Sequence, residues 1–307
     1  KKAVGVEIVQ EGRKQVLHAE TEVILSAGAI QSPQILQLSG IGPGKLLKEH
    51  GIDVVVNRPG VGQNLQDHYQ MRTVVQMRSR DSLNNQIRNP ISLLKMGLDW
   101  AFRGRGALTV GAGQVGGAMR TDFAPTDQPD LQLFVMPLSV DKPGEPLHRY
   151  PGFTSAIWQC HPKSRGSIEI VTPDPTADPK IQPNYLADEL DQKTMVEGIR
   201  ILRQIYNQPK FRDLWDAEIV PGEQVKTDAD IIDAIRKGGG TVYHPVGTCK
   251  MGIDAAAVVG PDLRVHGVTG LRVVDASIMP LITSANTNAP TLMIAEKAAE
   301  MILASGR

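Results

Sequence analysis

The sequence predicts α/β segments at both ends of the chain and an α+β portion in its middle. Near the start, the apolar run of residues 22–28 leads into a helical pattern, and near the end residues 271–275 do the same. A strand followed by a helix is the repeating unit of α/β sheets. From about residue 69 to residue 240, short alternating strands mix with amphipathic helices, which is typical of an antiparallel sheet with helices packed on it.

The charge balance argues against a chain specialised for nucleic acids or anionic membranes. Thirty-three basic residues offset thirty-three acidic ones among 307, so neither sign dominates. The apolar fraction of 41% fits a globular protein, and no apolar run is long enough to span a bilayer. The two cysteines, Cys160 and Cys249, provide neither a disulfide framework nor a metal-ligand cluster, and reduced thiols favour a cytoplasmic location.

The first portion opens with a hairpin and continues into a strand and two helices. Residues 4–9 and 15–20 alternate apolar and polar side chains around a polar turn. Residues 22–28 predict a strand buried on both faces, whose glycine end lets a ligand approach the backbone closely. Ser32-Pro33 is expected to open the next helix, and a second short helix is expected over residues 45–50.

A polar, glycine-rich loop over residues 57–68 connects the first portion to the middle. It ends in Asp67-His68, two residue types that often work together in catalysis. Neighbours in sequence rarely face one another productively, so we expect His68 to have a structural role in anchoring the loop.

The middle portion is expected to form the antiparallel sheet and its helices. Expected strands cover residues 74–77, 131–136 and 153–161, and expected helices cover residues 91–102, 192–207 and 228–237. Residues 168–171 alternate after a turn, which suggests a hairpin partner for the strand over residues 153–161. The proline-rich stretch 173–183 indicates an extended surface connection.

The last portion contains the residues whose setting most suggests chemistry. His244 is wedged between Tyr243 and Pro245 after three glycines, in a turn that would hold its ring rigidly. Residues 271–275 form a strand that delivers Asp275 at its carboxyl end, where α/β sheets bind ligands. After a polar loop, a final helix is expected over residues 290–304.

Three blocks of the chain, residues 28–43, 243–252 and 270–291, share their motifs and order with one known family. Together they resemble the glucose–methanol–choline (GMC) family of FAD-dependent alcohol oxidoreductases. The resemblance implies an α/β, Rossmann-like FAD-binding domain portion and an α+β substrate domain with an antiparallel sheet. It assigns residues 1–68 to the FAD-binding domain, 69–240 to the substrate-binding domain, and 241–307 to the return into the FAD-binding domain.

The N-terminal part of the family fold is expected to be missing from this chain. In the family a glycine-rich dinucleotide fingerprint lies near the N-terminus, and nothing here reads as strand–GxGxxG–helix; Gly111-Ala112-Gly113 and residues 238–240 are the nearest candidates. The chain also begins directly in a strand, without an initiator methionine. We therefore expect a separate N-terminal chain that carries most of the FAD pyrophosphate site.

The resemblance implies a catalytic pair. Oxidising an alcohol requires a base within hydrogen-bond reach of the hydroxyl, with a pKa near the working pH. The His-Pro-Val-Gly-Thr motif assigns this role to His244, whereas the remaining histidines are expected to be satisfied core or surface residues: His18, His50, His68, His148, His161 and His266. The second member maps to Asn286, with Asn288 as the neighbouring choice; an asparagine orients the substrate oxygen but does not act as a base. From composition alone, these asparagines would only shape a turn.

Cofactor and substrate contacts also follow from the resemblance. Asp275 and Ala276 are expected to meet the ribityl–pyrophosphate part of FAD. Residues 286–288 (Asn286, Thr287, Asn288) precede or begin the last helix, whose positive end would favour the reduced flavin anion. Tyr243 and Trp158 are candidates for the substrate pocket, and Trp158 is equally well interpreted as a core residue.

The predicted function is oxidation of a primary alcohol to the aldehyde, with His244 taking the hydroxyl proton and the hydride passing to flavin N5. Oxygen or another electron acceptor would reoxidise the flavin, and no metal is required. The alternatives are a redox-silent lyase of the same fold, a non-catalytic FAD-binding fragment and, remotely, a photodecarboxylase. Anaerobic bleaching of the flavin by an alcohol would separate the oxidoreductase from the lyase.

Overall fold

A computed structural model describes residues 1–79, 82–109, 111, 113–141 and 144–305 and divides the chain into two compact units. The first unit contains residues 1–68, 161–187 and 243–307, and the second contains residues 69–160 and 188–242. The first segment of the first unit ends at His68. Residues 161–187 differ, because the sequence placed them in the middle domain.

Hydrogen bonds explain why residues 161–187 lie with the first unit. Gly166 and Leu65 exchange backbone hydrogen bonds of 2.9 and 3.0 Å, and the Ile168 amide donates to the Gly62 carbonyl at 2.7 Å. The buried Gln37 side chain donates to the Ile168 carbonyl at 2.9 Å and accepts from the Ile170 amide at 2.9 Å. These long-range contacts are invisible to sequence periodicity.

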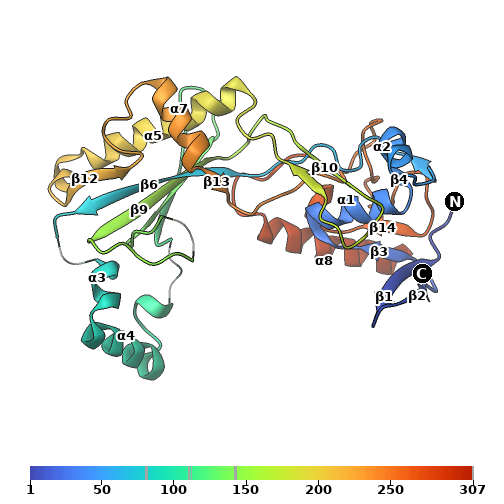
Figure 1. The fold of residues 1–307 in the computed structure, drawn as a ribbon, viewed down its shortest axis with the longest axis horizontal. Coiled ribbons are helices and arrows are strands. Elements are labelled where there is room, and N and C mark those ends of the chain that lie inside the picture. The colour runs from blue at the N-terminus through green and yellow to red at the C-terminus, as the bar shows by residue number, and fades with distance from the viewer. Residues whose placement is uncertain (80–81, 110, 112, 142–143, 306–307) are drawn as a thin grey trace. The chain divides into compact units, whose positions relative to one another are not determined.

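The first unit combines a hairpin, a parallel strand pair and helices (Figure 1). Its elements are β1 (Gly5–Gln10), β2 (Arg13–His18), β3 (Val23–Leu25), α1 (Gly28–Leu38), β4 (Ile41–Gly42), α2 (Gly44–Glu49), β5 (Val56–Asn57), β10 (Ser167–Glu169), β11 (Lys180–Gln182), β14 (Leu271–Val273), the 3-10 helix η2 (Ala276–Ile278) and α8 (Asn288–Ser305). β1 and β2 form the predicted hairpin. β14 pairs with β3 in parallel, so both strands end on the same side.

β3 is not buried on both faces, so that expectation is wrong. Val23 and Leu25 pack against the main apolar cluster of the first unit, which includes Val273 and Ile278. Ile24 alternates to the opposite face, where 45% of its side chain is exposed.

Helix α1 begins at Gly28, four residues before the predicted start, and Pro33 lies inside it. Proline lacks the amide hydrogen that would bond to the carbonyl four residues earlier, on Ala29. The Thr248 hydroxyl donates to that carbonyl at 2.6 Å, and both residues are buried. A side chain from the His244 segment therefore offsets the cost of an interior proline.

The β10 pairing corrects a second expectation. β10 pairs with β11 in antiparallel register, with Ile168 opposite Ile181, rather than with the strand that contains residues 153–159. The proline-rich stretch 173–183 thus includes a short strand, β11, whose side chains are exposed.

The second unit is built on an antiparallel sheet with the strand order β12-β6-β9-β8-β7, and β13 also pairs with β6. Its elements are β6 (Tyr69–Met77), α3 (Leu83–Arg88), α4 (Pro90–Arg103), the 3-10 helix η1 (Ala107–Thr109), β7 (Val115–Met119), β8 (Leu131–Met136), β9 (Gly152–Gln159), α5 (Glu189–Tyr206), α6 (Pro209–Arg212), β12 (Trp215–Val220), α7 (Asp228–Gly238) and β13 (Gly240–Thr241). α5 and α7 lie over the sheet (Figure 1). Gly111 and Gly113 of the fingerprint candidate lie outside any helix or strand, and Ala112 lies outside the described residues.

Every residue of β9 is buried, because the strand lies inside the sheet with β6 and β8 on either side. Gly198 of α5 approaches this strand so closely that an added Cβ would lie 2.6 Å from Ile157 Cδ1. Within the described part of the chain, no helix combines the length and apolar character needed to cross a membrane.

Candidate active site

His244 is held in a strained turn of the first unit. The preceding residue, Tyr243, has φ of 62°, in the left-handed region that a side chain disfavours, and 78% of it is exposed. The His244 amide donates to the Asp67 carboxylate at 2.9 Å, and the Tyr185 hydroxyl donates to the other oxygen of that carboxylate. His244 itself is only 7% exposed, so its ring is fixed below the surface.

The loop over residues 64–68 supports the His244 segment. Gln66 and Val246 exchange backbone hydrogen bonds of 2.9 and 3.0 Å, and the Asn64 amide donates to the Gly247 carbonyl at 3.2 Å. Gly247 has φ of 92°, and a Cβ there would lie 2.6 Å from the Asn64 carbonyl oxygen. Only glycine fits this approach.

The two ring nitrogens of His244 each meet a polar side chain. Nδ1 lies 2.9 Å from Nδ1 of His68, and Nε2 lies 3.1 Å from Nδ2 of Asn286. The two imidazole planes are nearly perpendicular, at 87°, and His68 is fully buried. Burial lowers the pKa of His244 below its usual 6.5, and the nearby Asp67 carboxylate opposes that shift. The imidazole is therefore neutral at pH 7, as a base requires.

Asn286 lies on an exposed loop that another histidine anchors. His161 contacts the Ile282 carbonyl through Nδ1 at 3.3 Å and the Ser284 hydroxyl through Nε2 at 2.9 Å. Asn288 begins helix α8. Of the two asparagines that the sequence offered, Asn286 is thus the one found beside the His244 ring.

Asp275 joins the carboxyl ends of the two parallel strands. One carboxylate oxygen accepts from the Gly28 amide at 2.9 Å and from the Ser32 hydroxyl, while the other accepts from the Ser277 amide at 2.8 Å. Gly28 has φ of 82°, and an added Cβ would meet no atom within 4 Å. Open space beside a glycine backbone at the ends of parallel strands suits a dinucleotide.

The two candidate substrate residues differ in setting. Tyr243 is exposed in the first unit beside the catalytic candidate, whereas Trp158 lies in β9 of the second unit and is 3% exposed. The Trp158 ring packs edge-on against Phe134, with centroids 5.4 Å apart.

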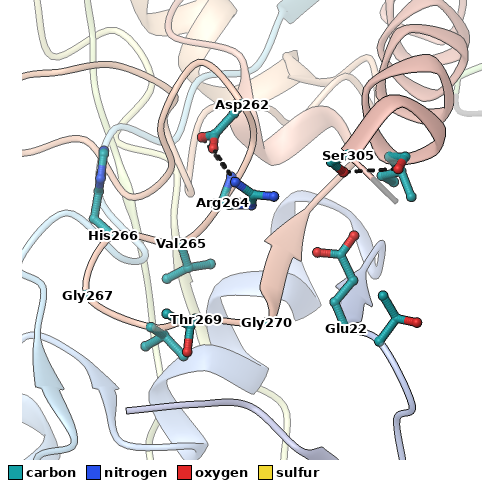
Figure 2. Close-up of a pocket in the computed structure, with 12 residues that line it drawn as sticks. Glu22, Asp262, Arg264, Val265, His266, Gly267, Thr269, Gly270 and Ser305 are labelled. Carbon is teal, nitrogen blue, oxygen red and sulfur yellow. Dashed lines mark hydrogen bonds and ion pairs between the residues drawn. The ribbon is translucent and has the colours of Figure 1, made fainter. Parts of the chain in front are cut away.

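A cavity of about 560 Å³ lies at the other end of the strand pair (Figure 2). It is lined by Glu22, which precedes β3, by Gly270, which precedes β14, and by the Asp262–Arg264 ion pair. Because Asp275 follows β14 at its carboxyl end, this cavity is distinct from the His244–Asp275 region.

The described residues contain neither a reactive thiol nor a cluster of potential metal ligands. Burial raises the pKa of the Cys249 thiol strongly and that of the Cys160 thiol to about 11, so both are protonated and poorly nucleophilic. No cluster of three or more His, Cys, Asp or Glu side chains in the described part of the chain is arranged to hold a metal ion.

Comparison with protein-family models identifies the family to which the chain belongs. Models described as GMC oxidoreductase match residues 1–70 and residues 162–295. The chain belongs to the GMC oxidoreductase family. The predicted fold class is confirmed, since the chain superimposes on formate oxidase from Aspergillus oryzae with a TM-score of 0.92, at 28% identity, covering 99% of this chain and 58% of that one. Pyridoxine 4-oxidase from Mesorbium loti gives a TM-score of 0.81 at 28% identity, covering 97% and 54%.

Curated relatives are closer in sequence. The alcohol dehydrogenase [acceptor] of Pseudomonas putida is 43% identical, covering 99% of this chain and 55% of the relative. The oxygen-dependent choline dehydrogenase 1 of Chromohalobacter salexigens is 40% identical, covering 98% and 54%. The chain thus spans about half the length of the curated relatives it matches. FAD is the cofactor of the family.

Sequence reasoning missed the residues that surround His244. It treated His68 as a loop anchor and left Thr248, His161 and Tyr185 without roles. The one available signal was the loop segment Asn64–His68, in which every residue except Leu65 is polar.

Proposed function

We propose that the protein oxidises a primary alcohol to the aldehyde with FAD, and that His244 is the base. The observation that carries this proposal is the pairing of His244 Nε2 with the Asn286 amide, on a ring whose pKa burial lowers. The names of the alcohol and choline dehydrogenase relatives support the substrate class.

In this proposal the substrate hydroxyl binds between His244 and Asn286. Nε2 of His244 accepts the hydroxyl proton, and the Asn286 amide orients the oxygen as it gains negative charge. FAD, when bound, supplies a two-electron acceptor for the hydride from the same carbon. The rigid turn at Tyr243 keeps the His244 ring from rotating away during these events.

The cofactor would be held at the carboxyl ends of β3 and β14. Asp275 keeps the Gly28 turn open, and Ala276 allows the backbone to approach the ribityl–pyrophosphate part. Thr287 and Asn288 lie at the N-terminus of the 18-residue helix α8, where a positive dipole end favours an anionic flavin. The first unit would thus serve as the FAD-binding portion and the second as the substrate portion.

Two further contributions complete the proposal. Tyr243, exposed beside His244, would contact the substrate, and Trp158 is the substrate candidate in the second unit. A separate N-terminal segment would supply the glycine-rich fingerprint of the family, which is consistent with the chain spanning about half of its relatives. Oxygen or another acceptor would then reoxidise the flavin.

An anaerobic reduction experiment tests this function. The chain is supplied with FAD and mixed with aryl and aliphatic primary alcohols, while the oxidised-flavin absorbance is followed. We expect bleaching, and we expect His244→Asn to slow it about 10²–10⁴-fold, the usual contribution of a general base. His266→Asn is the matched control, because His266 contacts the Gly252 carbonyl at 3.1 Å and has no proposed role.

Three outcomes would contradict parts of the proposal. Bleaching at an unchanged rate in His244→Asn would remove His244 as the base. A bound flavin that keeps its absorbance with every alcohol would favour the redox-silent lyase. Failure of the chain to bind FAD alone would show that the contacts near Asp275 are insufficient without the N-terminal segment.

A further inference from the structure

We propose that His68 is a positioning residue that sets the tautomer of His244 and shares its proton. The tautomer follows from geometry alone, while its consequence for alcohol oxidation rests on the proposed function. The two residues are 176 positions apart in the sequence, yet their Nδ1 atoms lie 2.9 Å apart.

A contact of 2.9 Å between two ring nitrogens requires one hydrogen between them. If both nitrogens were bare, their lone pairs would repel, and if both carried hydrogens, the hydrogens would clash. One imidazole therefore donates through Nδ1 and the other accepts. The protonation states of His68 and His244 are coupled, and they titrate as a pair.

The contact at Nε2 of His244 determines which of the two Nδ1 atoms donates the hydrogen bond. The Asn286 amide presents Nδ2, a donor, to Nε2 at 3.1 Å, so Nε2 carries a lone pair. In neutral His244 the hydrogen is then on Nδ1 and is donated to Nδ1 of His68. With the reverse direction, Nε2 would carry the hydrogen and would have no lone pair to accept the substrate proton. His68 must accept for His244 to be a base.

The same contact stabilises the product of proton uptake. When Nε2 gains a proton, His244 becomes an imidazolium whose Nδ1 hydrogen faces the His68 lone pair, and such charge-assisted hydrogen bonds are stronger than neutral ones. His68 is fully buried, so a second positive charge on its ring is disfavoured and one charge is shared by the pair. Among the described residues, the titratable groups bonded to this segment include the Asp67 carboxylate on the His244 amide and the Tyr185 hydroxyl on Asp67.

Adjacent residues of one loop thus hold His244 at two points. Asp67 fixes its backbone and His68 fixes its ring, while Gln66 pairs with Val246 to align the two segments. Neither a helix nor a strand would turn Asp67 and His68 toward the same residue, because neighbouring side chains on those elements point in different directions. This explains why a loop carries them.

Ring nitrogen NMR tests the proposal on the chain itself, without flavin or substrate. Histidine is labelled with ¹⁵N in the chain, and long-range ¹H–¹⁵N correlations report which nitrogen of each ring is protonated. The His244 signals are those lost in His244→Asn. We expect His244 to have a protonated Nδ1 and a bare Nε2, and His68 to have a bare Nδ1.

Two substitutions separate positioning from simple packing. In His68→Asn the amide oxygen takes a place close to that of Nδ1 and accepts the same hydrogen bond, so the Nδ1–H tautomer of His244 is retained. In His68→Leu the acceptor is removed, so we expect that tautomer to be lost in favour of Nε2–H. His266→Asn serves as the control and leaves the His244 signals in place.

Several results would overturn the proposal. A wild-type His244 protonated at Nε2 would do so, and so would an Nδ1–H tautomer that persists in His68→Leu. If His68→Leu does not fold, as judged by circular dichroism, the wild-type and His68→Asn spectra decide, since loss of the tautomer in His68→Asn also contradicts the acceptor role.

The tautomer and the proposed function fail independently. If His244 has the expected tautomer but no alcohol reduces the flavin, His68 still positions His244 and the oxidation is wrong. If alcohols reduce the flavin but the tautomer is reversed, the function stands and the role of His68 is wrong. Where both hold, His68→Leu should also shift the pH profile of kcat/KM, whereas His68→Asn should preserve its shape.

Discussion

The surroundings of His244 and the sheet of the second unit are both buried, but they are filled differently. Around His244, buried polar groups satisfy one another: Asp67, Gln66 and His68 all bond to the segment that follows Tyr243. In the second unit, Ile157 in β9 packs under α5. Apolar packing has no direction, whereas each hydrogen bond around His244 needs one donor and one acceptor.

Because of this contrast, the two regions should respond to different substitutions. Removing volume from the sheet changes stability and leaves the chemistry of the first unit alone. Removing a donor or an acceptor near His244 leaves a buried group unpaired, which changes both stability and protonation.

The largest expected effect is in the sheet. Ile157→Ala removes a fully buried side chain from β9, and large-to-small core substitutions of this type cost about 2–5 kcal/mol. Ile219→Ala, in β12 of the same sheet, is the matched control; it is 42% exposed and should cost less than about 1 kcal/mol. Urea unfolding followed by tryptophan fluorescence measures both, since Trp158 and Trp215 lie in this sheet.

The histidine NMR spectra test whether packing in the sheet and protonation at His244 are independent. Ile157→Ala should leave the His244 ring signals unchanged under native conditions. A changed tautomer in Ile157→Ala, or equal costs for Ile157→Ala and Ile219→Ala, would contradict the separation of packing from protonation.

A smaller effect on stability is expected at the hydrogen bond between the Thr248 hydroxyl and the Ala29 carbonyl of helix α1. Thr248→Val removes the hydroxyl that donates to the Ala29 carbonyl and leaves that carbonyl unpaired beside Pro33, at a cost of about 1–3 kcal/mol. Thr248→Ser keeps the hydroxyl and should recover most of the loss. Denaturant midpoints of the two variants measure the difference; equal midpoints would show that the hydrogen bond does not support helix α1.

Local pattern in the sequence was sufficient for several elements. Strand β8 has the bounds that alternation predicted, residues 131–136, and the β1–β2 hairpin was predicted because its turn and its period of two are both local. The asparagine beside His244 was chosen by resemblance to the family, whereas the parallel pairing of β3 with β14 was not predicted.

Other features depended on residues far away in the sequence. The start of α1 was missed because a threonine 219 positions later satisfies the carbonyl that Pro33 frees. The pairing of β10 was wrong because Gln37 and Gly62 hold residues 168–170 in the first unit. The contact of His68 with His244 was not predicted because a hydrogen bond across 176 positions leaves no periodic signal.

The smallest expected effect is a pH dependence of stability in the first unit. Burial lowers the pKa of folded His244 below the usual 6.5 of the unfolded chain. Above pH 6.5 the ring is neutral in both states and contributes no dependence. Below pH 6.5 the unfolded chain binds a proton that the folded chain resists, so the free energy of unfolding falls until the pH reaches the lowered pKa.

Comparing wild type with His244→Asn measures the contribution of the His244–His68 pair, because the two rings share a hydrogen. The measured quantity is the difference in unfolding free energy between the two proteins, followed from pH 8 to pH 5. We expect this difference in unfolding free energy to be constant above pH 6.5. Below pH 6.5, the unfolding free energy of wild type should fall relative to that of His244→Asn. Ile157→Ala, whose substitution removes no titrating group, should give a difference from wild type that stays flat over the same range. If the difference in unfolding free energy between wild type and His244→Asn did not change with pH, the folded His244 ring would accept a proton as readily as the unfolded one. The stability of the buried polar network around His244 would then depend on pH no more than that of the apolar sheet.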